Sequence, residues 1–292
     1  MRTAALAVVT AMAVVCLTAG SGLASGHGHK APKKVGILLV AFGSSEASAQ
    51  VSFDNIDRKV TAAYPGVPVR WAYTSHIIRA KMARQGKVLD APEVALARML
   101  DEKFTHVAVQ SLHTIAGEEY HDLQRTVGGF KLMGGFQRIV LGYPLLATQD
   151  DMARTVAAIL GIVPGERKKD EAVVLMGHGT HHPANAFYAA LMFQLQLQDP
   201  NIFIGTVEGY PELPLIQELL LKKNIKTAYL MPFMSVAGDH AKNDMAGPEE
   251  DSWVTVLTGA GIRCVPILRG TAEFDSFVDI WVSHIEAAMG HF

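Results

Sequence analysis

One pattern occurs twice in this chain: a continuous apolar run that ends at a glycine turn. The first copy is KKVGILLVAFGSS at residues 33–45, and the second is DEAVVLMGHGT at residues 170–180. Apolar runs without polar alternation are typical of strands that lie in a parallel sheet covered by helices on both faces. The sequence therefore predicts two copies of a parallel α/β unit.

The repeat extends beyond these two strands. Phe42-Gly43-Ser44 aligns with His178-Gly179-Thr180, and RIVLGYPLLATQDDMARTVAAIL with RCVPILRGTAEFDSFVDIWVSHI. VRWAYTSH aligns with IFIGTVEG, which we take to pair His76 with Glu208, and SLHTIAGEE aligns with PFMSVAGDH, which pairs Glu119 with His240. Each half then contains four strand–helix units. We expect an α/β fold with two Rossmann-like, doubly wound halves whose parallel sheets face a cleft.

The segments between the strands have helix signals. APEVALARMLDEKF has Pro92 near its start, which a first turn tolerates, and DDMARTVAAIL opens with acids that suit a helix N-terminus. The polar stretch PGERKKDE interrupts the pattern, so we divide the chain into an N-terminal domain at 34–166 and a C-terminal domain at 167–292. The closing WVSHIEAAMGHF is expected to be an amphipathic helix that packs across to the first half.

The composition restricts the class of protein. Hydrophobic residues make up 49% of the 292 residues and charged residues 18%, which is typical of a globular chain and not of a disordered one. The formal net charge is −2, so we expect no nucleic-acid partner. Exported α/β proteins of this size are often symmetric, and we expect a homo-oligomer.

The N-terminus has the pattern of a secretory signal peptide. Arg2 precedes a short apolar stretch, and small residues follow up to a cleavage site expected after Ala24. Val15 before Cys16 does not suit a lipoprotein signal, and no later segment is long and apolar enough to span a membrane. We therefore expect a signal peptide at 1–24, a flexible leader at 25–33 and a periplasmic mature protein. His27 and His29 in the leader either capture metal or belong to a polar spacer.

Chemically similar residues follow corresponding strands. His178, Glu208 and His240 come at the carboxyl ends of three strands in the second half, where ligands bind in doubly wound folds. Two imidazoles and a carboxylate suit a divalent first-row metal, and three protein ligands leave open positions for exchange. The alternative for any one of these residues is a structural role. Their common location favours a metal site.

Several motifs together resemble one enzyme family, the class II tetrapyrrole chelatases, and within it the anaerobic cobalt chelatases that act on sirohydrochlorin. The segments that carry this resemblance run in order through nearly the whole mature chain: LLVAFGSS, QSLHTIAGEEYHDL, GYPLL, VVLMGHGTHH, GTVEGYPE and LMPFMSVAGDHAKNDM with the following DSW. The resemblance implies ATP-independent insertion of Co(II), or of Fe(II), into sirohydrochlorin with release of two protons.

The resemblance also implies roles for individual residues. Metal binding falls on His178, Glu208 and His240, and Glu119 is a carboxylate that also faces the metal. Glu119, or one of the two histidines, would accept the pyrrole protons. A substrate with many carboxylates needs cations, which Arg79, Lys81, Arg84 and Lys87 provide unless they form only a solvated helix face. Phe42, Ser44, Ser45 and Tyr120 would contact the substrate, with core packing as the alternative for the aromatic residues.

Some features depart from this family. An export signal is unexpected because cobalamin synthesis is cytoplasmic, so a periplasmic metal- or haem-binding protein without turnover stays an alternative. A sirohydrochlorin ferrochelatase is another, because these ligand types barely separate Co(II) from Fe(II). His76 and His121 look particular to this chain. His121 is either an axial haem ligand at a subunit interface or a solvated helix residue.

Overall fold

The computed structural model describes residues 32–292. The expected signal peptide, Cys16, His27, His29 and nearly all of the leader lie outside the described residues. Within the described range, no helix combines the length and the apolar character needed to cross a bilayer.

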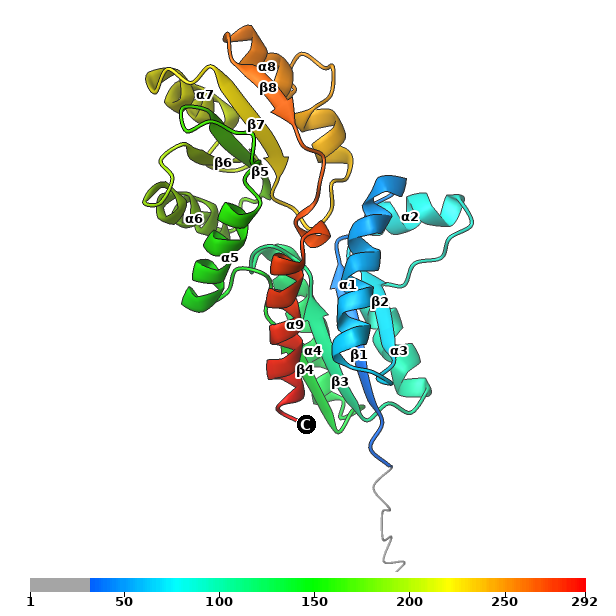
Figure 1. Ribbon diagram of the computed structural model, residues 1–292. Helices are drawn as coiled ribbons and strands as arrows, with labels where there is room; N and C mark the ends of the chain where they lie inside the picture. Colours follow the sequence, from blue (N-terminus) through cyan, green and yellow to red (C-terminus); the bar gives the residue numbers. More distant parts are fainter. Residues whose placement is uncertain (1–31) are drawn as a thin grey trace, which may run out of the picture. The chain divides into compact units, whose positions relative to one another are not determined.

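Eight strands form two separate parallel sheets in the described part of the chain (Figure 1). The strand order is β2-β1-β3-β4 in the first sheet and β6-β5-β7-β8 in the second, so the same winding occurs twice. The predicted duplicated α/β fold is therefore confirmed. The strands are β1 (Val35–Ala41), β2 (Val69–Tyr73), β3 (His106–Ser111), β4 (Arg138–Gly142), β5 (Ala172–Gly179), β6 (Ile202–Glu208), β7 (Thr227–Pro232) and β8 (Arg263–Pro266).

The strand register tests the alignment of the two halves. Val40 pairs with Ser111 and Met176 with Pro232, which supports the equivalence of Glu119 with His240, each eight residues further along. The expected equivalence of His76 with Glu208 is wrong by one residue. Ala41 pairs with Tyr73 and the matching Gly177 with Thr206, so Glu208 corresponds to Ser75. Ser75 is the N-cap of α2 and His76 its first residue, so the first half has a hydroxyl and not an imidazole at the position that matches Glu208.

Helices alternate with the strands, as the sequence pattern predicts. Pro92 begins its helix at the first turn, and a capping box of Thr148 and Asp151 starts the helix that follows β4. The helices are α1 (Gln50–Ala63), α2 (His76–Arg84), α3 (Pro92–Asp101), α4 (Glu118–Leu132), α5 (Gln149–Gly161), α6 (Ala186–Gln196), α7 (Leu213–Lys222), α8 (Trp253–Gly259) and α9 (Asp275–Met289). Short turns complete the set: η1 (Ala47–Ala49), η2 (Pro183–Asn185), the π-helical η3 (Ala241–Met245) and η4 (Thr271–Glu273).

The two halves exchange their last helices. Helix α9 follows β8 of the second sheet but packs against α1, β3 and β4 of the first half (Figure 1). Helix α5 follows β4 of the first sheet and contacts α6 of the second half as well as α9. The prediction that the closing helix packs across to the first half is confirmed. The division expected at residues 166 and 167 lies between α5 and β5, and the packing of α9 crosses it.

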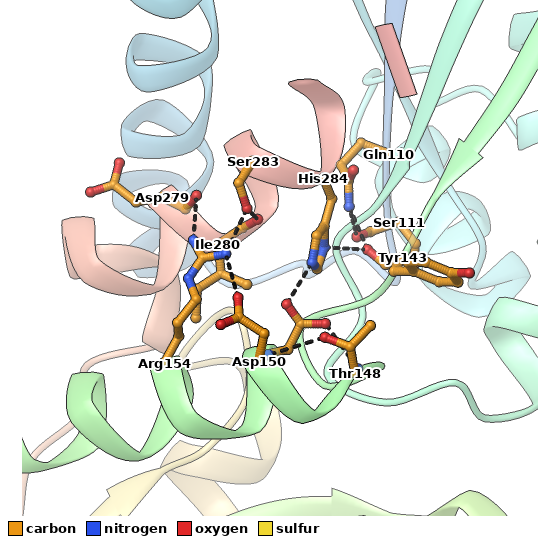
Figure 2. Close-up of polar contacts among 11 residues, drawn as sticks. Gln110, Ser111, Tyr143, Thr148, Asp150, Arg154, Asp279, Ile280, Ser283 and His284 are labelled. Atoms are coloured by element: carbon orange, nitrogen blue, oxygen red, sulfur yellow. Dashed lines mark hydrogen bonds and ion pairs between the residues drawn. The ribbon is translucent and has the colours of Figure 1, made fainter. Parts of the chain in front are cut away.

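A buried polar junction fixes α9 in this place (Figure 2). The ring of His284 reaches the backbone oxygen of Tyr143 through Nδ1, at 3.0 Å, and Asp151 Oδ1 through Nε2, at 2.8 Å. Both partners are buried, with 8% of His284 and 2% of Asp151 exposed. Arg154 of α5 adds a bond to Ser283 Oγ at 2.8 Å. Since buried polar groups need partners, this network specifies how α9 docks on the first half.

Candidate metal and tetrapyrrole site

His178 is the next-to-last residue of β5, directly before the glycine that ends the strand. Gly179 has a φ of +80°, and a Cβ there would lie 1.6 Å from the backbone oxygen of Glu208. Only glycine is compatible with that approach. The close pairing of β5 with β6 thus places His178 beside the carboxyl end of β6.

His240 comes to the same place from the loop after β7. It immediately precedes η3, a single π-helical turn of a kind that often occurs at functional sites. The rings of His178 and His240 lie 4.8 Å apart, nearly perpendicular to each other. Phe42 of the first half is also close, with its ring 6.2 Å from that of His178. The structure therefore brings together two of the three predicted metal ligands and one predicted substrate contact.

Both imidazoles have their Nδ1 atoms occupied. His178 Nδ1 lies 2.9 Å from the backbone oxygen of Gly179, and His240 Nδ1 bonds the carboxylate of Asp244. A carbonyl oxygen only accepts hydrogen bonds, as does an ionised carboxylate, so in each ring Nδ1 carries the hydrogen. In its neutral form, such a ring presents the lone pair of Nε2, and this is the form in which imidazole binds a metal.

Glu208, the third predicted ligand, is the last residue of β6 and its side chain is exposed. Across the two strands Glu208 pairs with Gly179, the residue that follows His178. Among residues 32–292, no three or more His, Cys, Asp or Glu side chains lie close enough together to hold a metal ion. The assembled part of the predicted site is therefore the histidine pair, and the role of Glu208 stays a prediction.

Glu119 is the second residue of α4 and is half-buried. It lines a cavity of about 510 Å³ together with other first-half residues, among them His76 and Arg79. The Arg79 guanidinium in this cavity donates to the backbone oxygens of Tyr73 and Thr74, at 2.5 and 2.6 Å. Glu119 and Arg79, assigned to different tasks by the sequence, thus share one polar cavity.

The other predicted substrate contacts differ in accessibility. Phe42 is 41% exposed, and Ser44 and Ser45 beside it are half-buried. Tyr120 is only 6% exposed, and burial together with nearby Tyr143 raises its pKa to about 12. That burial agrees with core packing, the alternative considered for this residue. Lys81, Arg84 and Lys87 are exposed on and just after α2.

His121 lies in the first turn of α4 and is half-buried. Its Nε2 lies 3.1 Å from the backbone oxygen of Ala116. Its ring lies 4.9 Å from that of His182, which follows β5 in the other half. An axial bond from His121 to haem would use Nδ1 or would break the bond to Ala116.

Three residues of the site were missed by sequence reasoning. Asp244 holds His240, and an ion pair joins Glu46 of the first half to Lys242 of the second. The spacing of His240 and Asp244, four residues in HAKND, would have indicated their contact had that segment been taken as helical. Glu46 and Lys242 are 196 residues apart, and no local pattern connects them.

Comparison with known protein families gives one match over most of the chain. The family model described as Cobalt chelatase (CbiK) matches residues 35–290.

Two relatives share substantial identity. One, a sirohydrochlorin cobaltochelatase CbiKC from Nitratidesulfovibrio vulgaris, is 47% identical over 261 residues, which is 89% of this chain and 93% of that protein. Another, a sirohydrochlorin cobaltochelatase from Salmonella typhimurium, is 36% identical over 258 residues, or 88% of this chain and 97% of that protein. Among solved structures, SirB from Bacillus subtilis with Fe3+ has a TM-score of 0.58 at 16% identity, covering 87% of this chain and 95% of that one. This last similarity concerns the fold alone.

Proposed function

Because the chain belongs to the cobalt chelatase (CbiK) family, we propose that it inserts Co(II) into sirohydrochlorin without ATP, releasing two protons. The observation that carries the proposal is the pairing of His178 with His240, whose rings lie 4.8 Å apart at the carboxyl ends of the second sheet. Such a pair supplies neutral imidazole ligands for a first-row divalent ion. The relatives, named as sirohydrochlorin cobaltochelatases, support the same substrate and metal.

The histidine pair holds the incoming metal in this proposal. Metal–imidazole bonds are about 2.0–2.1 Å long, so one ion can reach both Nε2 atoms from ring centres this close. The carboxylate of Asp244 fixes the orientation and the tautomer of the His240 ring. A third ligand neutralises charge, and Glu208 at the end of β6 is our candidate. Its exposed side chain is free to turn toward the ion.

The macrocycle must lose two pyrrole protons as the metal enters. We assign the acceptance of these protons to Glu119, a half-buried carboxylate at the start of α4. Phe42, which reaches the His178 ring from the first half, would lie against the macrocycle. Ser44, Ser45 and Arg79 would bond the carboxylates of the substrate.

The finer choice of metal is part of the proposal. Imidazole and carboxylate ligands barely discriminate Co(II) from Fe(II), so a sirohydrochlorin ferrochelatase is the alternative within the same chemistry. A competition assay with equal concentrations of both ions under anaerobic conditions decides between them.

We further propose that the chain is exported and forms a symmetric oligomer. Export is supported by the signal-peptide pattern of residues 1–24, and cell fractionation with mass measurement of the mature chain tests it. Oligomerisation is supported only by the general prevalence of symmetric assemblies. Light scattering of the purified protein, with and without haem, tests both the assembly and a role of His121 in haem binding.

The decisive experiment is the anaerobic absorbance of sirohydrochlorin mixed with purified protein and Co(II). Wild type should convert the spectrum rapidly, whereas His178→Ala and His240→Ala should lose this acceleration. His291→Ala, an exposed histidine near the C-terminus, is the matched control and should behave as wild type. Tight metal or haem binding with no acceleration over the protein-free rate would instead identify a periplasmic binding protein.

A further inference from the structure

The loop that carries His240 is anchored to the opposite half by an ion pair. Lys242, two residues after His240 in the π-turn η3, bonds Glu46 with its Nζ 2.6 Å from Oε2. Glu46 belongs to the first half, where it precedes η1 and helix α1. Its backbone N–H donates to Ser44 Oγ at 3.1 Å. The contact therefore joins the glycine-turn loop of the first sheet to the metal-ligand loop of the second.

The two loops also approach closely where the Ser44 side chain meets Gly238. A Cβ added to Gly238 would lie 3.2 Å from Ser44 Oγ. The backbone N–H of Lys242 donates to the carbonyl oxygen of Gly238 at 3.2 Å, which closes the turn around His240. The first half thus contacts this loop two residues before His240, at Gly238, and two residues after it, at Lys242.

The charges of this pair are partly shielded from water. The side chains of Lys242 and Glu46 are 35% and 25% exposed. The hydrogen bond from Lys242, and then the positive charges of Lys242 and Lys81, lower the pKa of Glu46 below its usual value, although partial burial opposes this. A single pair of this exposure contributes little to global stability. Its effect should be local, on the position of the turn.

We propose that Glu46 and Lys242 are positioning residues for the metal site, which couple the first half of the protein to the placement of His240. The inference rests on the proposed function, because it assigns a task to the same metal site. The physical reason is geometric: metal ligands must be held within a fraction of an ångström. Buried Ala241 and Met245 hold η3 on the second half, and Lys242 between them ties the same turn to the first half. Glu46 supplies a fixed point because η1 and α1 follow it directly.

The test is a double-mutant cycle read by metal binding. The purified variants Glu46→Gln, Lys242→Met and the double variant are titrated with Co(II), and thermal melting is recorded for each. Each single variant should weaken Co(II) binding about fivefold or more, and the double variant should be no weaker than the worse single one. Lys242→Arg, which preserves the ion pair, should bind as wild type. We prefer this variant to a swap of the two charged residues, because the positive charge of Lys81 also acts on Glu46 and would not be reversed by the swap.

The matched control is the ion pair of Arg70 with Glu102, which joins N and O at 2.8 Å within the first half. Glu102→Gln removes the same charge and should leave Co(II) binding unchanged. Three results would overturn the proposal: binding by Glu46→Gln as tight as that of Glu102→Gln, fully additive effects in the double variant, or a melting temperature that falls in parallel with affinity. Direct titration does not depend on turnover, so failure of metal insertion in wild type would refute the proposed function and leave this result standing.

Discussion

The carboxylate of Asp244 holds the Nδ1 atom of His240, four residues earlier in the chain. The π-turn makes this contact possible because it places both residues on the same side of η3. A histidine oriented in this way presents Nε2 outward and keeps one tautomer. The relationship gives Asp244 a definite task at the site, which the following prediction tests.

Replacing Asp244 by alanine should weaken Co(II) binding by about 10–100-fold, because the ring of His240 loses the hydrogen bond that fixes its orientation and tautomer. Isothermal titration or a competing chelator gives the dissociation constant. Asp239→Ala is the control, since Asp239 lies in the same loop but bonds Asn243. Equal losses in the two variants would mean that the loop as a whole, and not the Asp244 contact, determines affinity.

Measurements of kcat and of Co(II) affinity should distinguish the roles of Glu119 and Glu208. Glu119→Gln should lower kcat about 100-fold or more and leave Co(II) affinity unchanged, because a general base acts on proton transfer alone. Glu208→Gln should instead weaken Co(II) binding. Glu118→Gln, the exposed neighbour of Glu119, serves as control. A loss of Co(II) affinity in Glu119→Gln would make Glu119 a metal ligand.

The fold was predictable because the information is local and repeated. Continuous apolar runs identify β1 and β5 as buried parallel strands, and the glycine turns after them place His178 at a strand end. The same rule placed His240 near His178, since the carboxyl ends of parallel neighbours meet at one edge of the sheet. These inferences needed only periodicity and strand order.

What the sequence could not predict depends on contacts between distant segments. The packing of α9 on the first half was predicted, but the polar contacts that specify it were not, because His284 is more than a hundred residues from both Tyr143 and Asp151. The pairing of His76 with Glu208 was wrong for another reason: matched position by position, VRWAYTSH and IFIGTVEG already place Ser75 opposite Glu208, as the strand register does. Glu119 lies in a first-half cavity because α4 determines its direction, which strand order alone leaves open.

His113 should make the stability of the protein depend on pH. Burial lowers its pKa from the ordinary value of 6.5 to about 4, and in the described part of the chain its Nε2 is buried without a hydrogen-bond partner. As the pH falls, the unfolded chain takes up this proton first. The contribution of neutral His113 to the free energy of unfolding is therefore complete above about pH 6.5 and is lost as the pH falls toward 4.

The measurement is urea unfolding of wild type and His113→Gln at several pH values. The difference in the free energy of unfolding between them should change by at most about 1.4 kcal/mol per pH unit across this window. His291→Gln, which removes an exposed histidine, should run parallel to wild type. A difference between wild type and His113→Gln that is independent of pH would show that His113 does not carry this proton uptake.

The junction between α9 and the first half should be a major contributor to stability. Within residues 32–292, His284→Ala leaves the carboxylate of Asp151, which is 2% exposed, with the backbone N–H of Thr148 as its one remaining hydrogen-bond partner, at 3.0 Å. Removing one member of a buried pair in this way costs about 3 kcal/mol, read as a lower urea midpoint. Arg58→Ala removes an ion pair with Asp275 that also joins the first half to α9 but is more than half exposed. That control should cost less than about 1 kcal/mol, so similar losses in both variants would refute a special role for the buried pair.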